Sequence, residues 1–292
     1  MLPKTLALTP SSPPHSPHQY LDTNLSSGAA HPKSQKWLVD GFCWYSKGMI
    51  RKCFTSFGIN GTERVRSITE TQPLIVYANH ASWWDPIVAM LARKEAMPMR
   101  TLYAPIDSEM LENYAVLKKM GFYGVKLESY AGAQQFLVHS KTILERPNAS
   151  IWITPEGKFC DVRDHTQSLM PGMAHLASRV PGIACVPLAI EYPFWDDSRP
   201  HIFCMFGKPV EMGPNEAKDK EAWSTVLTRA LRKTQADLAA NVMLRDPKAF
   251  EYIVESRAKK LGWYDHARSM TAWIRGKEFD PRHSHAMKKR QK

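Results

Sequence analysis

The stretch LIVYANHASWWDP, residues 74–86, decides the fold because a strand signal, a polar turn and a helix start follow one another within it. Residues 74–78 are apolar or aromatic and partly β-branched, which is typical of a buried strand. Asn79 and His80 then begin a polar turn, and Asp85-Pro86 has the form of a helix start, with a capping carboxylate followed by proline. Strand, turn and helix in this order predict an α/β unit.

The same alternation continues along the chain. Short apolar runs predict strands at 100–104, 122–127, 150–153, 183–190 and 201–206. Apolar spacings of three and four residues predict helices at 107–120, 133–145 and 170–179, and helical structure from 216 onward. We therefore expect an α/β fold with a mixed β-sheet flanked by helices, an N-terminal amphipathic helix and a helical C-terminal extension.

The N-terminal amphipathic helix is expected at residues 36–57. Its apolar residues recur at helical spacing, as Trp37, Leu38, Phe42, Tyr45, Met49, Ile50 and Phe54. Basic residues are interleaved with them, at Lys36, Lys47, Arg51 and Lys52. This pattern fits a helix packed on the core and a helix lying among lipid headgroups equally well, since both need an apolar stripe.

The composition of the chain indicates which classes of partner to expect. The chain has 39 Lys and Arg against 28 Asp and Glu, and its formal net charge of +11 favours an anionic partner such as a phospholipid surface or nucleic acid. It contains no recognisable nucleic-acid motif, so no nucleic acid is expected. No apolar run approaches the roughly 20 residues that span a bilayer. If the protein works at a membrane, it is therefore expected to lie on the membrane surface. The five cysteines form no Cys-x-x-Cys pair, which indicates neither a disulfide framework nor a zinc site.

His80 and Asp85 are the strongest candidates for chemistry. Histidine titrates near neutrality, and a carboxylate can hold it in the tautomer that accepts a proton. Taken alone, the pair fits a turn histidine and a helix cap equally well. A second polar turn, Pro155-Glu156-Gly157-Lys158, follows the strand expected at 150–153. Sites in open α/β sheets gather at the carboxyl ends of strands, so the two turns are expected to meet and to activate a hydroxyl.

Other candidates fit structural roles better. Ser82 lacks a Gly-x-Ser-x-Gly elbow and is expected to brace the turn. Cys160 is expected to be a packed thiol. His165 and His175, with Asp164, match no zinc spacing. The adjacent residues Trp83 and Trp84 fit core packing, an acyl tunnel or an interfacial seat.

Three blocks in order carry a resemblance to a known family. Asn79, His80 and Asp85 match its Asn-His-x4-Asp block, residues 155–157 match a Pro-Glu-Gly block, and residues 186–187 match a Val-Pro pair. Over roughly residues 74–210 the sequence resembles the glycerolipid acyltransferase family, which includes 1-acylglycerol-3-phosphate acyltransferases.

The resemblance implies an enzyme that moves a fatty acyl group from acyl-CoA or acyl carrier protein to a hydroxyl of a lysophospholipid or glycerol phosphate. His80 would be the general base, Asp85 would orient it, and Glu156 and Gly157 would help to bind the acceptor. No cofactor and no metal are implied. The expected location is cytoplasmic, with peripheral association to an anionic phospholipid membrane.

Composition, helical spacing and the resemblance together predict three segments. Residues 1–35, rich in Pro, Ser and His, are expected to be disordered. Residues 36–215 would form the acyltransferase domain, and 216–292 a helical C-terminal extension with a basic tail.

Two departures from the family pattern matter. The family has a further block, Gly-x-Ile-x-Val-Asp-Arg, before the Pro-Glu-Gly block; residues 121–127 keep its glycine and valine, but Leu127 stands where it has arginine. Lys158-Phe159 stands where the Pro-Glu-Gly block commonly continues with Thr-Arg. Lys126, Lys158 or Arg163 could supply the missing cation, or the acceptor could differ from glycerol phosphate. The departures also motivate an alternative, a catalytically impaired lipid-binding protein of the same fold.

Overall fold

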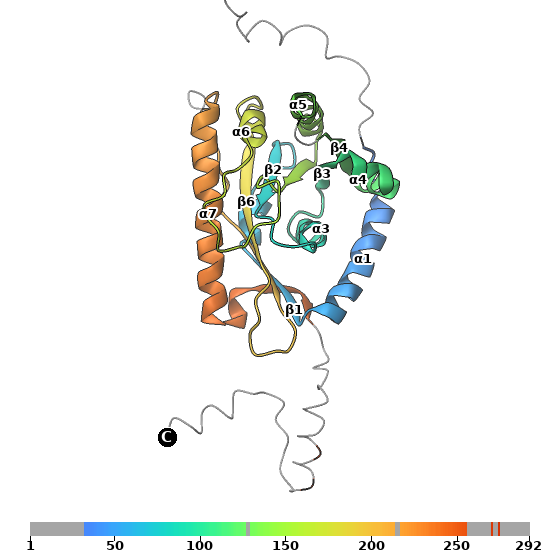
Figure 1. The fold of residues 1–292 in the computed structure, drawn as a ribbon, viewed down its shortest axis with the longest axis vertical. Coiled ribbons are helices and arrows are strands. Elements are labelled where there is room, and N and C mark those ends of the chain that lie inside the picture. The colour runs from blue at the N-terminus through green and yellow to red at the C-terminus, as the bar shows by residue number, and fades with distance from the viewer. Residues whose placement is uncertain (1–31, 127–128, 214–216, 256–269, 271–273, 275–292) are drawn as a thin grey trace, which may run out of the picture. The chain divides into compact units, whose positions relative to one another are not determined.

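The computed structural model describes residues 32–126, 129–213, 217–255, 270 and 274. Within these ranges the chain forms a mixed eight-stranded sheet with helices on both faces, which confirms the expected α/β fold (Figure 1). Three expectations lie outside the described residues. They concern most of the segment expected to be disordered, Leu127, which stands where the family has arginine, and nearly all of the expected basic tail. None of the helices described is both long enough and apolar enough to cross a bilayer.

The order of strands across the sheet is β4-β3-β5-β2-β6-β7-β1-β8. The strands are β1 (Ser56–Asn60), β2 (Leu74–Ala78), β3 (Thr101–Asp107), β4 (Phe122–Val125), β5 (Ala149–Ile153), β6 (Ala184–Glu191), β7 (Ile202–Phe206) and β8 (Glu251–Glu255). The helices are α1 (Lys36–Cys53), α2 (Thr62–Arg66), α3 (Asp85–Ala96), α4 (Ser108–Asn113), α5 (Tyr130–Leu144), α6 (Pro171–Ala177) and α7 (Lys220–Leu244). The described residues also include the 3-10 helices η2 (Ala115–Met120) and η3 (Pro247–Ala249).

Strand β2 lies between β5 and β6 within a parallel block formed by β4, β3, β5, β2 and β6. Its side chains alternate between two apolar layers. Val76 packs in the layer shared with α1 and α3, whereas Ile75 and Tyr77 pack in the layer shared with α5, α6 and α7. Because both faces are covered, every residue of β2 is buried, which explains the unbroken apolar run in the sequence.

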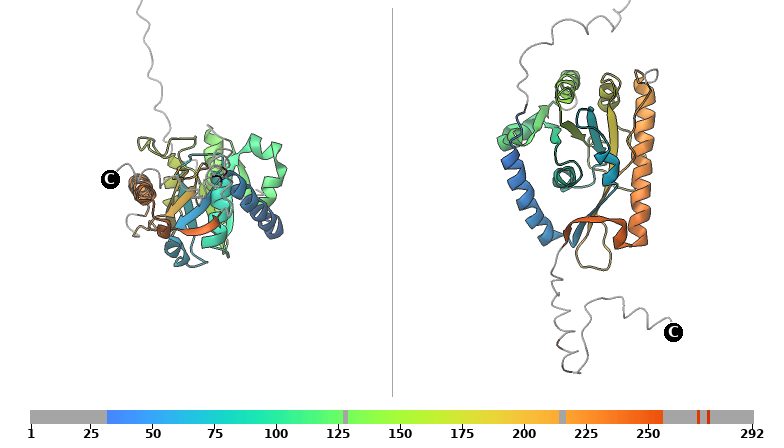
Figure 2. Two further views of the ribbon diagram at one scale, coloured as in Figure 1. Left: turned by 90° about the horizontal axis from the view of Figure 1, so that it is seen from below. Right: turned by 180° about the vertical axis from the view of Figure 1, so that it is seen from behind.

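The two layers of helices lie on opposite faces of the sheet. Figure 2 shows the same arrangement from below and from behind, with α1 and α7 on opposite sides of the strands. Helix α1 packs by a narrow stripe composed of Val39, Cys43, Ser46 and Ile50. Helix α7 buries Trp223, Leu227, Leu231 and Leu238 against the other face.

Two strands were not expected from the sequence. Strand β1 begins within the last two residues of the helix expected at 36–57, and β8 lies in the region expected to be helical from 216 onward. They pair with each other in antiparallel fashion, and β1 also pairs in parallel with β7. Both strands depend on partners distant in sequence, which a local pattern does not report.

The helix expected at 107–120 was also wrong as a single element. Asp107 caps α4 by accepting a hydrogen bond from Glu109 N, but the helix ends at Asn113. Tyr114 has φ −125° and ψ 66°, outside the helical region, and the chain resumes as the 3-10 helix η2. The apolar spacing continued across this break because both short helices bury residues against the same layer.

Candidate active site

The site lies where three neighbouring parallel strands, β5, β2 and β6, end at the same edge of the sheet. Strand β2 is followed by His80, β5 by Glu156 and β6 by Tyr192. The ends of β2 and β6 are joined by Asn79, whose side-chain amide donates to Ile190 O at 3.0 Å and whose Oδ1 accepts from Ile190 N at 2.8 Å. Asn79 therefore extends the sheet pairing by its side chain and fixes the backbone just before His80.

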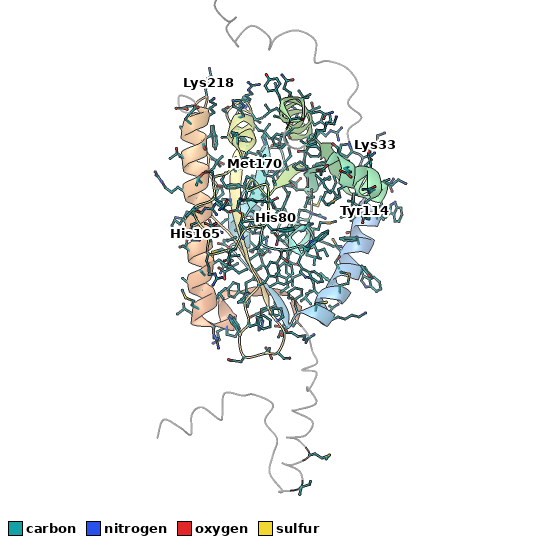
Figure 3. The ribbon with its side chains drawn as sticks, in the orientation of Figure 1. Lys33, His80, Tyr114, His165, Met170 and Lys218 are labelled. Carbon is teal, nitrogen blue, oxygen red and sulfur yellow. The ribbon has the colours of Figure 1, made fainter. Side chains whose placement is uncertain are left out.

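His80 and Asp85 are in direct contact. The His80 Nδ1 atom lies 2.8 Å from Asp85 Oδ2, and the histidine side chain is 21% exposed whereas that of Asp85 is 3% exposed. In Figure 3, His80 lies in the interior of the view, whereas Tyr114 at the end of α4 lies at its edge. With Nδ1 bound to the carboxylate, Nε2 is the nitrogen left to accept a proton.

Asp85 does not cap α3 in the expected way. It is the first residue of the helix, and its carboxylate turns back toward the preceding loop. Oδ2 accepts hydrogen bonds from Ala81 N at 2.8 Å and Ser82 N at 3.0 Å, and Oδ1 accepts one from Tyr192 Oη at 2.5 Å. A buried carboxylate is costly unless donors surround it, and these contacts supply them.

Glu156 binds the backbone of His80. Its Oε2 accepts a hydrogen bond from His80 N at 2.9 Å, and its Oε1 lies 2.7 Å from Arg232 Nη1 on α7. Arg232 also donates to Gln167 O at 2.6 Å and to Gln235 Oε1 at 2.7 Å. Both oxygens of Glu156 are thus bound within the protein, so this residue acts on the site through the His80 backbone.

The turn after Glu156 closes around His80. Gly157 has φ +70°, and its N donates to Thr154 O at 3.1 Å. A side chain at this position would place Cβ 2.6 Å from Met170 Sδ. Three residues on, Cys160 N donates to His80 O at 2.8 Å, so Glu156 and Cys160 together hold the His80 backbone at both its N–H and its carbonyl.

Aromatic side chains flank the imidazole. The Phe159 ring centroid lies 4.3 Å from that of His80 and 6.5 Å from that of Trp83. Trp83 is 77% exposed and Phe159 is 52% exposed, whereas Trp84 packs edge-on against Phe54 at 4.9 Å. Trp83 therefore faces solvent near His80, whereas the adjacent Trp84 joins the core.

The three candidate cations lie away from the buried part of the site. Lys126 and Lys158 are exposed. Arg163 forms a surface pair with Asp161, with Nε 2.8 Å from Oδ1 and Nη2 2.7 Å from Oδ2. The arginine that does reach the site is Arg232, which sequence reasoning missed because it lies in a helix far beyond the three blocks.

Of the minor candidates, Ser82 has a structural role. Ser82 Oγ accepts a hydrogen bond from Trp84 N at 3.3 Å and so braces the turn. Burial, together with the negative charge of Glu156, raises the pKa of the Cys160 thiol, which disfavours the thiolate. Asp164 is bound by Thr166 and Gln167, His165 is exposed, and burial lowers the pKa of His175 on α6.

Comparison with known protein families gives a match. Residues 57–191 match the family described as Acyltransferase. No curated protein shows significant similarity to the chain. The matched segment contains all three blocks and the strands β2, β5 and β6 that carry them. The match over residues 57–191 supports the acyltransferase family that the three ordered blocks of the sequence predicted.

Proposed function

We propose that this acyltransferase moves a fatty acyl group from acyl-CoA or acyl carrier protein to a hydroxyl of a lysophospholipid or glycerol phosphate. The observation that carries the proposal is the contact of 2.8 Å between His80 Nδ1 and buried Asp85 Oδ2, at the sheet edge where ligands bind in α/β folds. The contact orients Nε2 for proton transfer, and the partial exposure of His80 leaves it within reach of an acceptor.

In the proposed reaction His80 Nε2 removes the proton from the acceptor hydroxyl. The oxygen attacks the thioester carbonyl and forms a tetrahedral intermediate, which collapses to the ester and expels the thiolate. The imidazolium then protonates the thiolate, so His80 returns to its neutral state. The Asp85 carboxylate stabilises the imidazolium between these steps, and no covalent acyl-enzyme is needed.

The test is the release of free thiol from a long-chain acyl-CoA in the presence of lysophosphatidic acid, glycerol 3-phosphate and other lysolipids, with ester product identified by mass spectrometry. The His80→Ala variant is expected to abolish transfer. His165→Ala is the matched control, because His165 is an exposed histidine on the loop after β5. Unchanged turnover in His80→Ala would remove His80 as the base.

A second candidate function is a catalytically impaired lipid-binding protein of the same fold. Phe159 favours it, since an aromatic ring packs on His80 where the family pattern commonly has a cation. The same acceptor panel separates the two: ester formed with any acceptor excludes the impaired protein, whereas lipid binding without transfer supports it.

We also propose that α1 lies on an anionic phospholipid surface, which would place the enzyme at a membrane as a peripheral protein. The face of α1 opposite its buried stripe exposes Trp37 by 73%, Trp44 by 80% and Tyr45 by 59%. Lys47 and Lys52 lie on the same helix. Exposed aromatic rings beside basic residues are typical of helices at a lipid interface.

A further inference from the structure

We propose that Tyr192 is a positioning residue that holds the Asp85 carboxylate in the orientation His80 needs. This inference rests on the proposed roles of His80 and Asp85. It is motivated by the division of contacts on the carboxylate: Oδ2 accepts from His80 Nδ1 and two backbone N–H groups, whereas Oδ1 accepts from Tyr192 Oη at 2.5 Å. Tyr192 therefore donates to Oδ1, whereas the loop N–H groups donate to Oδ2.

The sheet places Tyr192 for this role. Tyr192 directly follows β6, which runs parallel to β2 and next to it. The double hydrogen bond between Asn79 and Ile190 locks the two strand ends together just before His80 and Tyr192. The hydroxyl thus approaches Asp85 from one strand while the imidazole approaches from the other.

In the hydrogen bond between Tyr192 and Asp85, the phenol is the donor and the carboxylate is the acceptor. Burial, and then the negative charge of Asp85, raise the pKa of Tyr192 well above its usual range. The phenol therefore stays protonated and donates to the carboxylate. Asp85 is only 2% exposed, so water cannot readily replace this donor if it is lost.

The ring of Tyr192 also has packing contacts that must be separated from the role of its hydroxyl. Its centroid lies 6.0 Å from that of Phe54, next to the end of α1. Tyr192→Phe keeps the ring and removes only the hydroxyl. In this variant the carboxylate is held at Oδ2 alone and can turn about its bond, which loosens the hydrogen bond to Nδ1.

Two measurements on full-length Tyr192→Phe test the inference. The first is steady-state transfer from acyl-CoA, where a fall of roughly ten-fold in kcat with little change in KM is expected, because only orientation is lost. The second is the ¹⁵N spectrum of the His80 ring in the protein without substrate, where the fraction of the Nδ1–H tautomer is expected to fall. A residue that merely supports the fold would not move the tautomer.

Tyr77→Phe is the matched control. Tyr77 is a fully buried tyrosine of β2 whose hydroxyl donates to Leu227 O at 3.0 Å, away from Asp85. It is expected to keep the wild-type kcat and tautomer. A wild-type tautomer in Tyr192→Phe, or an equal loss in Tyr77→Phe, overturns the inference. If wild-type protein transfers no acyl group while the tautomer of Tyr192→Phe still changes, the proposed function fails and the positioning role stands.

Discussion

The guanidinium of Arg232 lies 2.7 Å from the carboxylate of Glu156, which in turn accepts a hydrogen bond from the His80 backbone. The two side chains are 12% and 1% exposed, so both charges are largely removed from water. Arg232 lies on α7, outside the segment that matches the family. A helix beyond the matched domain therefore stabilises the turn that carries the proposed base.

Arg232→Met is expected to lower the free energy of unfolding by about 3 kcal/mol, because it leaves the Glu156 charge buried without its partner. Denaturation in urea measures this change. Arg163→Met serves as the control, since Arg163 pairs with Asp161 at the surface and its loss is expected to have no measurable effect. Adding Glu156→Gln to Arg232→Met should recover part of the lost stability. Wild-type stability in Arg232→Met would contradict the role assigned to this pair.

Asp85→Asn is expected to leave the fold intact and to lower kcat by about 10³-fold or more, because the neutral amide no longer stabilises the imidazolium. Thiol release from acyl-CoA measures the rate, and circular dichroism checks the fold. Asp161→Asn, which alters an exposed carboxylate, should keep wild-type activity. A rate for Asp85→Asn within ten-fold of wild type would show that Asp85 does not serve the base.

Gly157→Ala is expected to be more destabilising than Gly182→Ala. Both glycines have positive φ, +70° and +67°, so both substitutions carry a backbone cost of about 1–3 kcal/mol. Only at Gly157 does the added Cβ also meet Met170 Sδ, at 2.6 Å, whereas the space around Gly182 is open. Urea denaturation of the two variants separates the steric from the conformational cost, and equal losses would mean that Met170 moves aside freely.

Trp44→Ala is expected to weaken binding to vesicles that contain anionic phospholipid by roughly ten-fold, because it removes an exposed aromatic ring from the proposed lipid-facing side of α1. Vesicle co-sedimentation measures the change, and added salt should weaken binding of the wild-type protein. Met243→Ala, which removes an exposed apolar side chain from α7, is the control. Equal binding by wild type and Trp44→Ala would place the lipid contact elsewhere.

Cys160→Ser is expected to retain most of the transferase activity. The raised pKa of the Cys160 thiol disfavours the thiolate at neutral pH, and the proposed reaction needs no acyl-enzyme. The backbone hydrogen bond from Cys160 N to His80 O does not depend on the side chain. Loss of activity together with a trapped acyl adduct on Cys160 in the wild-type protein would favour a thiol mechanism.

The sequence by itself determined the features that depend on neighbouring residues. The run at 74–78 predicted β2 at its observed bounds, and Asp85-Pro86 predicted the start of α3. The short spacing between His80 and Asp85 allowed their contact across a tight strand-to-helix connection, and the ordered blocks of the family pattern turned that possibility into a prediction. Strand–turn–helix order also predicted that Glu156 would lie at the same edge of the sheet as His80.

Only the tertiary structure decided which distant groups complete the site. Tyr192 meets Asp85 across 107 residues, and Arg232 meets Glu156 across 76. Strand β8 likewise depends on antiparallel pairing with β1, which is distant in sequence. These contacts follow from the order of strands in the sheet and from the packing of α7 on it, and neither leaves a periodic signal along the chain. The proposed base could therefore be identified locally, while the residues that hold it in place required the fold.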